Sequence, residues 1–340
     1  MHGMRGNHAV RTGLLAAIFV CCMPATSSAA GSNAVASTTS QSYPAKAIRF
    51  IVPFAPGGGT DFMTRLFAQK LSDAWGQQVV VDNRPGAAGI LGTDLAAKAA
   101  PDGYTLVMAS GSHNVNPSLY KKLPYDSIRD FAPVTLIATV PIVLSAHPAV
   151  AASSASELIT LAKTKPGQLS YASFGVGAIS HLAGELLKAS AGVDIVHVPY
   201  KGAGDAMSNL LAGQVQLMFS SPASVVPQFK AGKLRGLAVT GTHRQPAAPD
   251  IPTFTEAGLP QVDVSEWYGV LAPAGTPKPL VARLGNETAR ILRTPEVSQR
   301  IAQAQFAEPV GGTPEQFARF IETESAKLAK VIREANIRAE

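Results

Sequence analysis

The sequence has little cysteine, few aromatic residues, few charges and no long hydrophobic run. Its 340 residues include 2 Cys, and only 6% are aromatic and 15% charged. The formal net charge of +6 is spread along the chain, without a Lys/Arg block or an interleaving of basic and aromatic residues, so a nucleic-acid-binding protein is not indicated. No apolar run reaches the roughly 18–20 residues that a membrane-spanning helix needs.

The first 36 residues have the organisation of a secretory signal peptide. A positive end without acids precedes an apolar stretch, Gly13–Met23, and small residues follow up to an Ala-x-Ala site at Ala34–Ala36, with a competing site ending at Ala30. This order is typical of a cleaved export signal, whereas the apolar stretch is too short for a membrane anchor. We therefore predict a signal peptide over 1–36 and an exported protein.

Both cysteines lie inside this predicted signal peptide. Cys21 and Cys22 would leave with it, so the exported chain would have no disulfide, no cysteine-based zinc site and no thiol nucleophile. A lipoprotein anchor at Cys21 is the alternative, but Val20 precedes it where a small residue is usual.

From Tyr43 onward, strand-like and helix-like segments alternate, which predicts an α/β fold with parallel sheets. About 300 residues are more than a single hydrophobic core usually organises, so two domains are expected. The extended stretch Leu136–Ile142 and the Pro-rich stretch Gln245–Ser265 are the two predicted crossings between them. One lobe would comprise 43–140 and 263–340, and 141–262 would form an inserted second lobe, with a ligand cleft and a hinge between them. The last helix is predicted to begin with a capping box at Thr313–Gln316. The predicted strands are 48–54, 78–81, 104–109, 134–146, 169–172, 195–199, 215–219, 234–239 and 268–272.

Three glycine-rich loops, Val52–Asp61, Ser173–His181 and Tyr200–Asp205, each follow a predicted strand and precede a predicted helix. Glycine lets backbone N–H groups approach a ligand, and a helix N-terminus adds unpaired donors and the positive end of a dipole. Such loops can bind an anion without a cationic side chain. The alternative is that their polar residues only cap helices and their glycines only shape turns.

Several kinds of site are not indicated by these loops. None matches GxxxxGK(S/T), and Gly175-Val176-Gly177 lacks the third glycine of a dinucleotide fingerprint. The adjacent Ser112 and His113 do not make a catalytic triad, and His181 with Glu185 lacks the further ligands of a metal site. A small carboxylate fits better, with no catalytic residue, no metal and no cofactor.

Together, several segments give the chain from Tyr43 onward a resemblance to a known family. It resembles the Bug-type receptors, the periplasmic solute-binding proteins of the tripartite tricarboxylate transporter family. The segments that carry the resemblance, in chain order, are Tyr43–Pro44 with Ile48–Asp61, Val81–Gly89, Pro101–Leu106, His181–Glu185, Val198–Gly202, Ala231–Arg235 and Ala272–Pro277.

The resemblance implies a two-lobed, type II-like periplasmic binding protein that closes around a small organic acid. Ligands known in the family include di- and tricarboxylates, acidic amino acids and aromatic acids. The ligand carboxylate would be held largely by backbone groups and ordered water from the first two loops. The loop after Met108 and the segment after Phe219 would line the rest. The expected ligand-binding residues are Phe54, Pro56, Gly57, Gly58, Gly59, Thr60, Asp61, Ser110, Ser112, His113, Gly177, Ala178, Ile179, Ser180, His181, Tyr200, Ser220 and Ser221.

Two positions depart from the family pattern. Ala178 stands where Ser usually follows the last glycine of the second loop, and Ser220 stands where Asp usually follows the strand ending at Phe219. Because a ligand ammonium group needs a negative partner, the loss of that Asp leads to the hypothesis of a carboxylate ligand without an amino group.

The prediction is thus a monomeric receptor that binds a di- or tricarboxylate or an aromatic acid by hinge closure, for uptake through a membrane permease of the same transporter type or for sensing. The alternative is a secreted α/β hydrolase or isomerase that uses His113 or His181. A regulatory effector domain of similar shape is the third possibility, against which the signal peptide counts.

Overall fold

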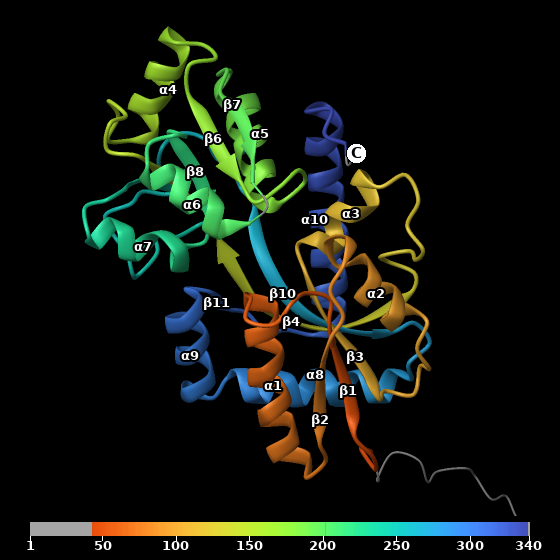
Figure 1. The fold of residues 1–340 in the computed structure, drawn as a ribbon. Helices are drawn as coiled ribbons and strands as arrows, with labels where there is room; N and C mark the ends of the chain where they lie inside the picture. Colours follow the sequence, from red (N-terminus) through yellow and green to blue (C-terminus); the bar gives the residue numbers. More distant parts are fainter. Residues whose placement is uncertain (1–42, 201, 339–340) are drawn as a thin grey trace, which may run out of the picture. The chain divides into compact units, whose positions relative to one another are not determined.

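A computed structural model describes residues 43–200 and 202–338 of the chain. The predicted signal peptide, with Cys21 and Cys22, lies outside the described residues. The described part is an α/β structure with two sheets, which confirms the predicted fold class (Figure 1).

The larger sheet has the strand order β11-β4-β10-β3-β1-β2. Strands β1, β2 and β3 run parallel, and β10 is antiparallel to both of its neighbours, β3 and β4. The bounds are β1 Ile48–Val52, β2 Val79–Asn83, β3 Thr105–Ser110, β4 Phe131–Pro141, β10 Ser265–Pro273 and β11 Glu308–Pro309.

The smaller sheet has the order β7-β6-β8-β5-β9. Its strands β6, β7 and β8 are parallel, and β5 is antiparallel to β8 and β9. The bounds are β5 Val143–Ala146, β6 Ser170–Ser173, β7 Val196–Pro199, β8 Leu217–Ser220 and β9 Arg235–Val239.

Helices follow most of the strands, as a parallel sheet requires. Figure 1 shows α4 to α7 around the smaller sheet, and α1, α8 and α9 beside the larger one. The bounds are α1 Gly59–Trp75, the short 3₁₀ helix Ala87–Gly89, α2 Ile90–Ala97, α3 Ser112–Leu119, α4 Ala155–Thr164, α5 Ile179–Ala191, α6 Ala203–Leu211, α7 Pro222–Lys230, α8 Lys278–Leu292, α9 Pro295–Gln305 and α10 Pro314–Glu334.

The predicted strand over 134–146 is in fact two strands in different sheets. Strand β4 ends at Pro141 and β5 begins at Val143, so the chain passes from one sheet to the other at Ile142. Thr240 holds this crossing: its backbone N–H donates to the Ile142 carbonyl at 2.9 Å, and its Oγ1 accepts from the Ile142 N–H at 2.8 Å. The sequence predicted a crossing in Leu136–Ile142, but the hydrophobic pattern is continuous there and predicted one strand over 134–146.

Helix α10 contributes to two hydrophobic cores. The capping box predicted at its start is present, with Thr313 accepting from the Gln316 N–H and Gln316 accepting from the Thr313 N–H. Near its start, Phe317 packs in a core with Trp267 of β10. Near its end, Leu328 packs in a core with strands of the smaller sheet. The helix therefore ties the two sheets together.

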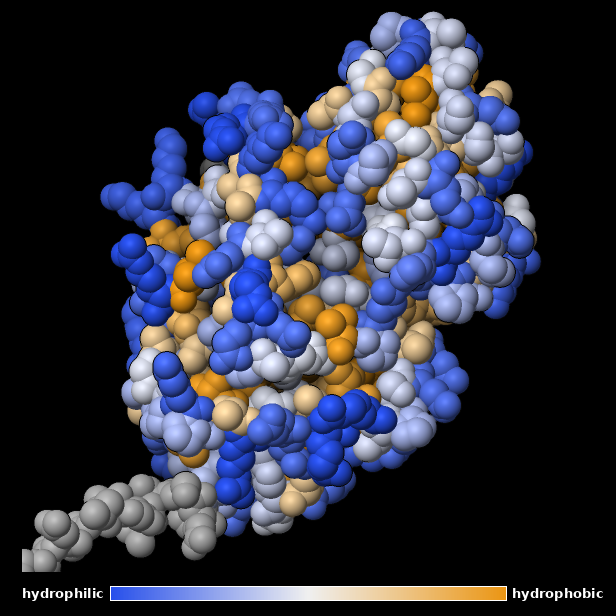
Figure 2. Space-filling view, turned by 180° about the vertical axis from the view of Figure 1, so that it is seen from behind, coloured by the Kyte–Doolittle hydropathy of each residue, from blue (hydrophilic) through white to orange (hydrophobic). Residues whose placement is uncertain are grey.

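The surface carries hydrophobic residues in scattered groups among polar ones on the face that Figure 2 shows. Among the described residues, no helix combines the length and hydrophobicity that a membrane crossing would need.

Gly184 provides a test of how closely α5 packs on the smaller sheet. A Cβ at this position would collide with the fully buried ring of Tyr171 on β6. We expect Gly184→Ala to lower the free energy of unfolding by about 1–3 kcal/mol, the usual cost of overpacking a core. Gly204 in α6 has open space at the same point, so Gly204→Ala should be neutral or stabilising by up to about 1 kcal/mol. Equal effects in urea unfolding would refute this close packing.

Candidate functional site

The predicted loops lie at corresponding edges of the two sheets. In the larger sheet, β1 and β3 are parallel and end at Val52 and Ser110. In the smaller sheet, β6 and β8 are parallel and end at Ser173 and Ser220. Ligands of open α/β sheets bind outside the carboxyl ends of the strands, so both edges are where a site is expected.

The first loop is held in shape by the carboxylate of Asp61. Its Oδ2 accepts from the backbone N–H of Gly57 at 3.0 Å and from Nε of Arg65 at 2.9 Å, and its Oδ1 accepts from Nδ2 of Asn83 at 2.9 Å. Burial alone would raise the pKa of Asp61, but these hydrogen bonds outweigh it and hold the pKa below its ordinary value. The predicted site residue Asp61 thus fixes the loop, and its expected contact with a ligand stays a prediction.

The start of α1 presents backbone donors that no side chain uses. The N-cap is Gly58, which makes no side-chain cap, and among the described residues the N–H groups of Gly59 and Thr60 have no acceptor. Thr60 and Asp61 therefore do not cap α1, contrary to the alternative considered from the sequence. Gly59 must be glycine, because a Cβ would collide with the hydroxyl group of Tyr268 on β10. Phe54 and Pro56 precede these residues; Phe54 is half-buried beside Gly89, and Pro56 is exposed.

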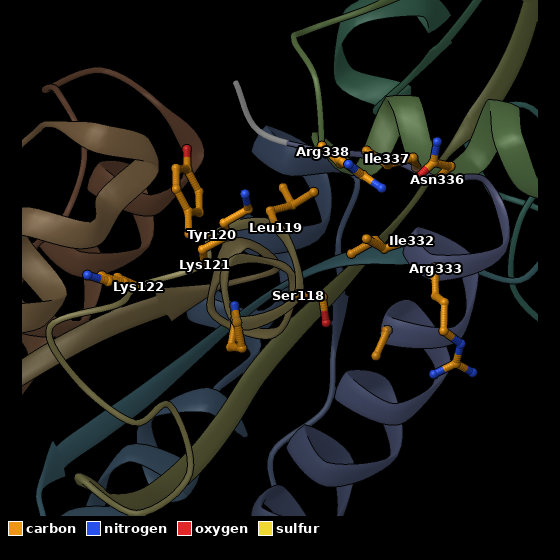
Figure 3. Close-up of a pocket in the computed structure, with 12 residues that line it drawn as sticks. Ser118, Leu119, Tyr120, Lys121, Lys122, Ile332, Arg333, Asn336, Ile337 and Arg338 are labelled. Atoms are coloured by element: carbon orange, nitrogen blue, oxygen red, sulfur yellow. The ribbon is translucent and has the colours of Figure 1, made fainter.

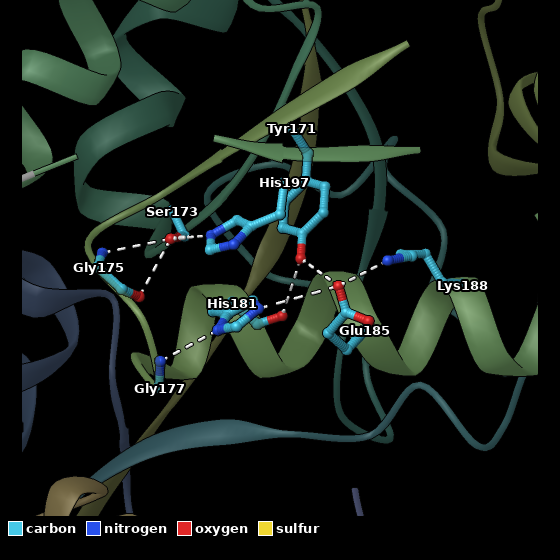
Figure 4. Close-up of polar contacts among 8 residues, drawn as sticks. All are labelled: Tyr171, Ser173, Gly175, Gly177, His181, Glu185, Lys188 and His197. Atoms are coloured by element: carbon cyan, nitrogen blue, oxygen red, sulfur yellow. Dashed lines mark hydrogen bonds and ion pairs between the residues drawn. The ribbon is translucent and has the colours of Figure 1, made fainter. Parts of the chain in front are cut away.

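The second loop is closed by two hydrogen bonds from its backbone to side chains of α5, and Figure 4 shows the one between Gly177 and His181. The Phe174 N–H donates to Oγ of Ser180 at 3.0 Å, and the Gly177 N–H donates to Nδ1 of His181 at 3.0 Å. The N-cap is Ala178, which makes no side-chain cap. Within the described chain, the N–H groups of Ile179 and Ser180 have no acceptor. The second loop therefore resembles the first: the side chains fix its shape and leave the helix donors unused.

Next to the second loop, the rings of two histidines stack face to face. The rings of His181 and His197 have centroids 3.8 Å apart at an interplanar angle of 7° (Figure 4). Nε2 of His197 lies 2.6 Å from Oγ of Ser173, where the loop begins. Glu185 accepts from the hydroxyl group of Tyr171 at 2.8 Å and pairs with Lys188 at 2.9 Å. Sequence reasoning missed His197, because its contact with His181 joins a strand to a helix.

The pKa values of both histidines are lowered, which favours their neutral forms. Burial, followed by the neighbouring His197, lowers the pKa of His181 to about 4, against a smaller opposing effect of Glu185. Burial likewise lowers the pKa of His197. A neutral His181 keeps the Nδ1 lone pair that accepts the Gly177 N–H, so the shape of the loop depends on this protonation state.

The loop after β3 brings the two sheets' edges together. The backbone N–H of Gly111 donates to Oε1 of Glu266 on β10 at 2.5 Å. A Cβ on Gly111 would lie 3.0 Å from Cδ1 of Ile179, the first residue of α5. A Cβ on Gly177 of the second loop would collide with Leu119 of α3. Glu266 was not predicted, because its strand position carries no loop or glycine signal.

The remaining predicted residues have different surroundings. Ser110 and Ser112 lie beside Gly111, with their hydroxyl groups 3.3 Å apart. His113 points into the core: its Nε2 donates to the Ser127 carbonyl at 2.7 Å, and burial lowers its pKa to about 4. Tyr200 follows β7, and its N–H donates to the Ser173 carbonyl at 3.0 Å.

Ser220 is the last residue of β8, the central strand of the smaller sheet, and Ser221 follows it. Ser220 is fully buried, and its Oγ has no hydrogen-bond partner among the described residues. Ser221 is the N-cap of α7, with its Oγ 3.3 Å from that of Ser224. These two hydroxyl groups replace the carboxylate that the resemblance would place here.

One cavity lies away from these loops. About 1100 Å³ in volume, it is formed by the end of α3 and the end of α10 and contains none of the predicted site residues (Figure 3). A cavity of about 580 Å³ adjoins the first loop and is lined in part by Gly57, Asp61 and Arg65. Among the described residues, no group of three or more His, Cys, Asp and Glu is placed to hold a metal ion.

The two α/β sheets and the uncapped helix starts at their strand ends suit a protein that binds a small anionic solute. A family model described as the tripartite tricarboxylate transporter family receptor matches residues 63–337, and the chain belongs to this family. Protein BugT of Bordetella pertussis is 39% identical over 301 residues, which span 88% of this chain and 92% of BugT. The predicted family is confirmed.

Solved structures agree with this assignment. A structure of a periplasmic transporter is 43% identical, with a TM-score of 0.76, and the match covers 87% of this chain and 99% of that one. The R. palustris protein Rpa4515 with adipate is 36% identical, with a TM-score of 0.77 and coverage of 87% and 100%. MatC from Rhodopseudomonas palustris with bound malate is 33% identical, with a TM-score of 0.72 and coverage of 85% and 100%.

The hydrogen bonds of Asp61 lead to a stability prediction. Asp61→Asn turns one acceptor into a donor that faces the donors of Gly57, Arg65 or Asn83, so we expect a loss of about 1–3 kcal/mol in the free energy of unfolding at pH 7. Because the native pKa of Asp61 is lowered, the extra stability of the wild type is fully present above the ordinary pKa of an aspartate. It is lost as the pH falls below that value and through the lowered native pKa. The control is Asp73→Asn on the same helix, where the carboxylate is exposed and the expected change is within about 0.5 kcal/mol.

His181 leads to a prediction about pH. Its native pKa of about 4 lies below the unfolded value, so its contribution to stability is complete above about pH 6.5 and is lost as the pH falls toward 4. The loss amounts to up to about 3 kcal/mol. His181→Asn offers an oxygen acceptor to the Gly177 N–H but does not titrate. Denaturant unfolding at pH 7 and pH 4.5 should show a smaller acid loss in this variant; an equal loss would assign the acid sensitivity to other groups.

Proposed function

We propose that this chain captures a small organic carboxylate, a di- or tricarboxylate or an aromatic acid, between two lobes that close about a hinge. The observation that carries the proposal is the pair of uncapped helix starts, where the N–H groups of Gly59, Thr60, Ile179 and Ser180 have no acceptor in the described part of the chain. Unused donors at the positive end of a helix suit a carboxylate. Relatives solved with adipate and with malate support this ligand class.

The lobes in this proposal are 43–140 with 263–340, and 141–262. Sheet membership supports these boundaries, because the strands up to Pro141 and from Ser265 onward belong to one sheet and those between belong to the other. A ligand that contacts both lobes favours the closed arrangement by its higher affinity for it. The crossings at Ile142 and before Ser265, together with α10, are then the segments that bend.

The receptor would act in the periplasm as a monomer after removal of residues 1–36, and would deliver its ligand to a membrane permease or a sensor. A catalytic function is not proposed. The histidines of the alternative hydrolase are both engaged, His113 in the core and His181 with the Gly177 N–H, and the family's members are solute-binding proteins. The direct test is a thermal-shift series with dicarboxylates, tricarboxylates and aromatic acids on protein refolded without ligand. An acid at a hundred times its dissociation constant should add about 2.7 kcal/mol, whereas no shift with any acid would refute the ligand class.

Gly58 allows binding to be separated from folding. Its backbone φ of −82° suits any residue, and a Cβ there meets open space. Gly58→Asp places a favourable N-cap on α1 but sets a negative charge beside the proposed carboxylate. We expect unchanged or higher stability and an affinity for the acid reduced about tenfold or more, because like charges a few ångströms apart repel.

The neutral variant Gly58→Asn is the matched control for this experiment. It has the same shape and a comparable capping ability, so it should bind the acid much more tightly than the Asp variant. If both variants bind equally, the start of α1 does not hold the negative end of the ligand.

A further inference from the structure

Glu266 places a carboxyl group where the loops of the two sheets come closest. Its Oε1 accepts from the backbone N–H groups of Gly111 at 2.5 Å and of Trp267 at 3.0 Å. Its Oε2 has no hydrogen-bond partner, and no cation pairs with this carboxylate, among residues 43–200 and 202–338. One oxygen is therefore fixed to the backbone, while the other is left to accept a hydrogen bond.

The neighbours of Glu266 belong to the proposed ligand site. The backbone of Gly111, which Glu266 binds, also lies against the side chain of Ile179 at the start of α5. Tyr268 stands two positions along β10, on the same face of the strand, and its hydroxyl group lies against Gly59 at the start of α1. Residues of one strand, spaced about 7 Å apart, thus connect the two helix starts.

The helix starts and Glu266 offer a ligand opposite kinds of polar group. The helix starts offer N–H donors, which suit the carboxylate of a ligand. Glu266 offers an acceptor, and in its ionised form it repels a second carboxylate. Burial raises the pKa of Glu266, although the two backbone hydrogen bonds act in the opposite direction.

We propose that Glu266 is a specificity-determining residue: its Oε2 accepts a hydrogen bond from a hydroxyl or ammonium group of the ligand, so that the receptor prefers an acid carrying such a donor to the plain dicarboxylate of the same length. This inference rests on the proposed function and deepens it. Ser220 leaves the end of β8 without a carboxylate, but β10 supplies one at Glu266. The missing carboxylate at position 220 is therefore no longer a reason to exclude a ligand with an amino group.

The test compares matched acids on the wild type and on Glu266→Gln. The acids are succinate, malate and aspartate, with adipate and 2-aminoadipate as a longer pair, and the readout is the dissociation constant from titration calorimetry at pH 7.5. In the wild type, the donor-bearing acid of at least one series should bind about tenfold or more tightly than its plain counterpart, as expected for a hydrogen bond to a charged acceptor.

In Glu266→Gln, this ratio should fall to about threefold or less, and the plain dicarboxylate should bind at least as tightly as before, because the repelling charge is gone. Glutamine retains an oxygen for the Gly111 N–H. The matched control is Glu322→Gln on the exposed face of α10, which makes the same charge change and should leave the ratio unchanged. Malate and aspartate distinguish a hydroxyl from an ammonium donor.

The same ratio in Glu266→Gln as in the wild type, or a wild-type preference for the plain dicarboxylate in both series, would overturn the inference while leaving the receptor function standing. Binding of none of these acids would overturn the inference and would count against the proposed ligand class. If Glu266→Gln does not fold, Glu266→Asp serves instead. Its carboxylate is withdrawn by one methylene group, so the ratio should fall while the plain acid is little affected; an unchanged ratio in that variant contradicts the inference.

Discussion

The proposed site depends on one constraint: the loops before α1 and α5 must be held in shape by groups other than the helix donors they present. Asp61 does this in the first loop, with hydrogen bonds to Gly57, Arg65 and Asn83. Ser180 and His181 do it in the second. An ordinary N-cap would consume the donors that an anion needs, as Thr313 does at α10 and Ser154 at α4. Because these other side chains hold each loop in shape, the N–H groups at the helix starts stay available for an anion.

The second constraint is continuity between the sheets. The chain passes from β4 to β5 through a single residue, Ile142, and Thr240 binds both polar groups of its backbone. Helix α10 packs Phe317 into one core and Leu328 into another. In the closure that we propose, the two sheets would move relative to one another by bending about these segments.

Much of this architecture could be predicted from the sequence, because its signals are local. Short apolar runs followed by glycine-rich loops predicted β1 with α1 and β6 with α5, and Thr313–Gln316 predicted the start of α10. Helices α2, α3, α7 and α9 were not predicted from the sequence, and Pro117 and Pro227 interrupt the pattern of α3 and α7. The stretch Leu136–Ile142 was predicted as a crossing, but the division of the strand into β4 and β5 was not, because both strands are apolar.

The contacts that shape the site were less predictable, because they join residues far apart in the chain. Gly111 and Glu266 are separated by 155 positions, and no spacing rule connects them. The sequence could show that Ser220 is not an acid, but it could not show that another strand brings an acid to a neighbouring edge. Whether a site carries a charge depends on which strands begin or end at its edge of the sheet. The start of β10 lies at this edge because β10 runs antiparallel to β3. The ligand preference that we propose thus depends on sheet topology as much as on the loops.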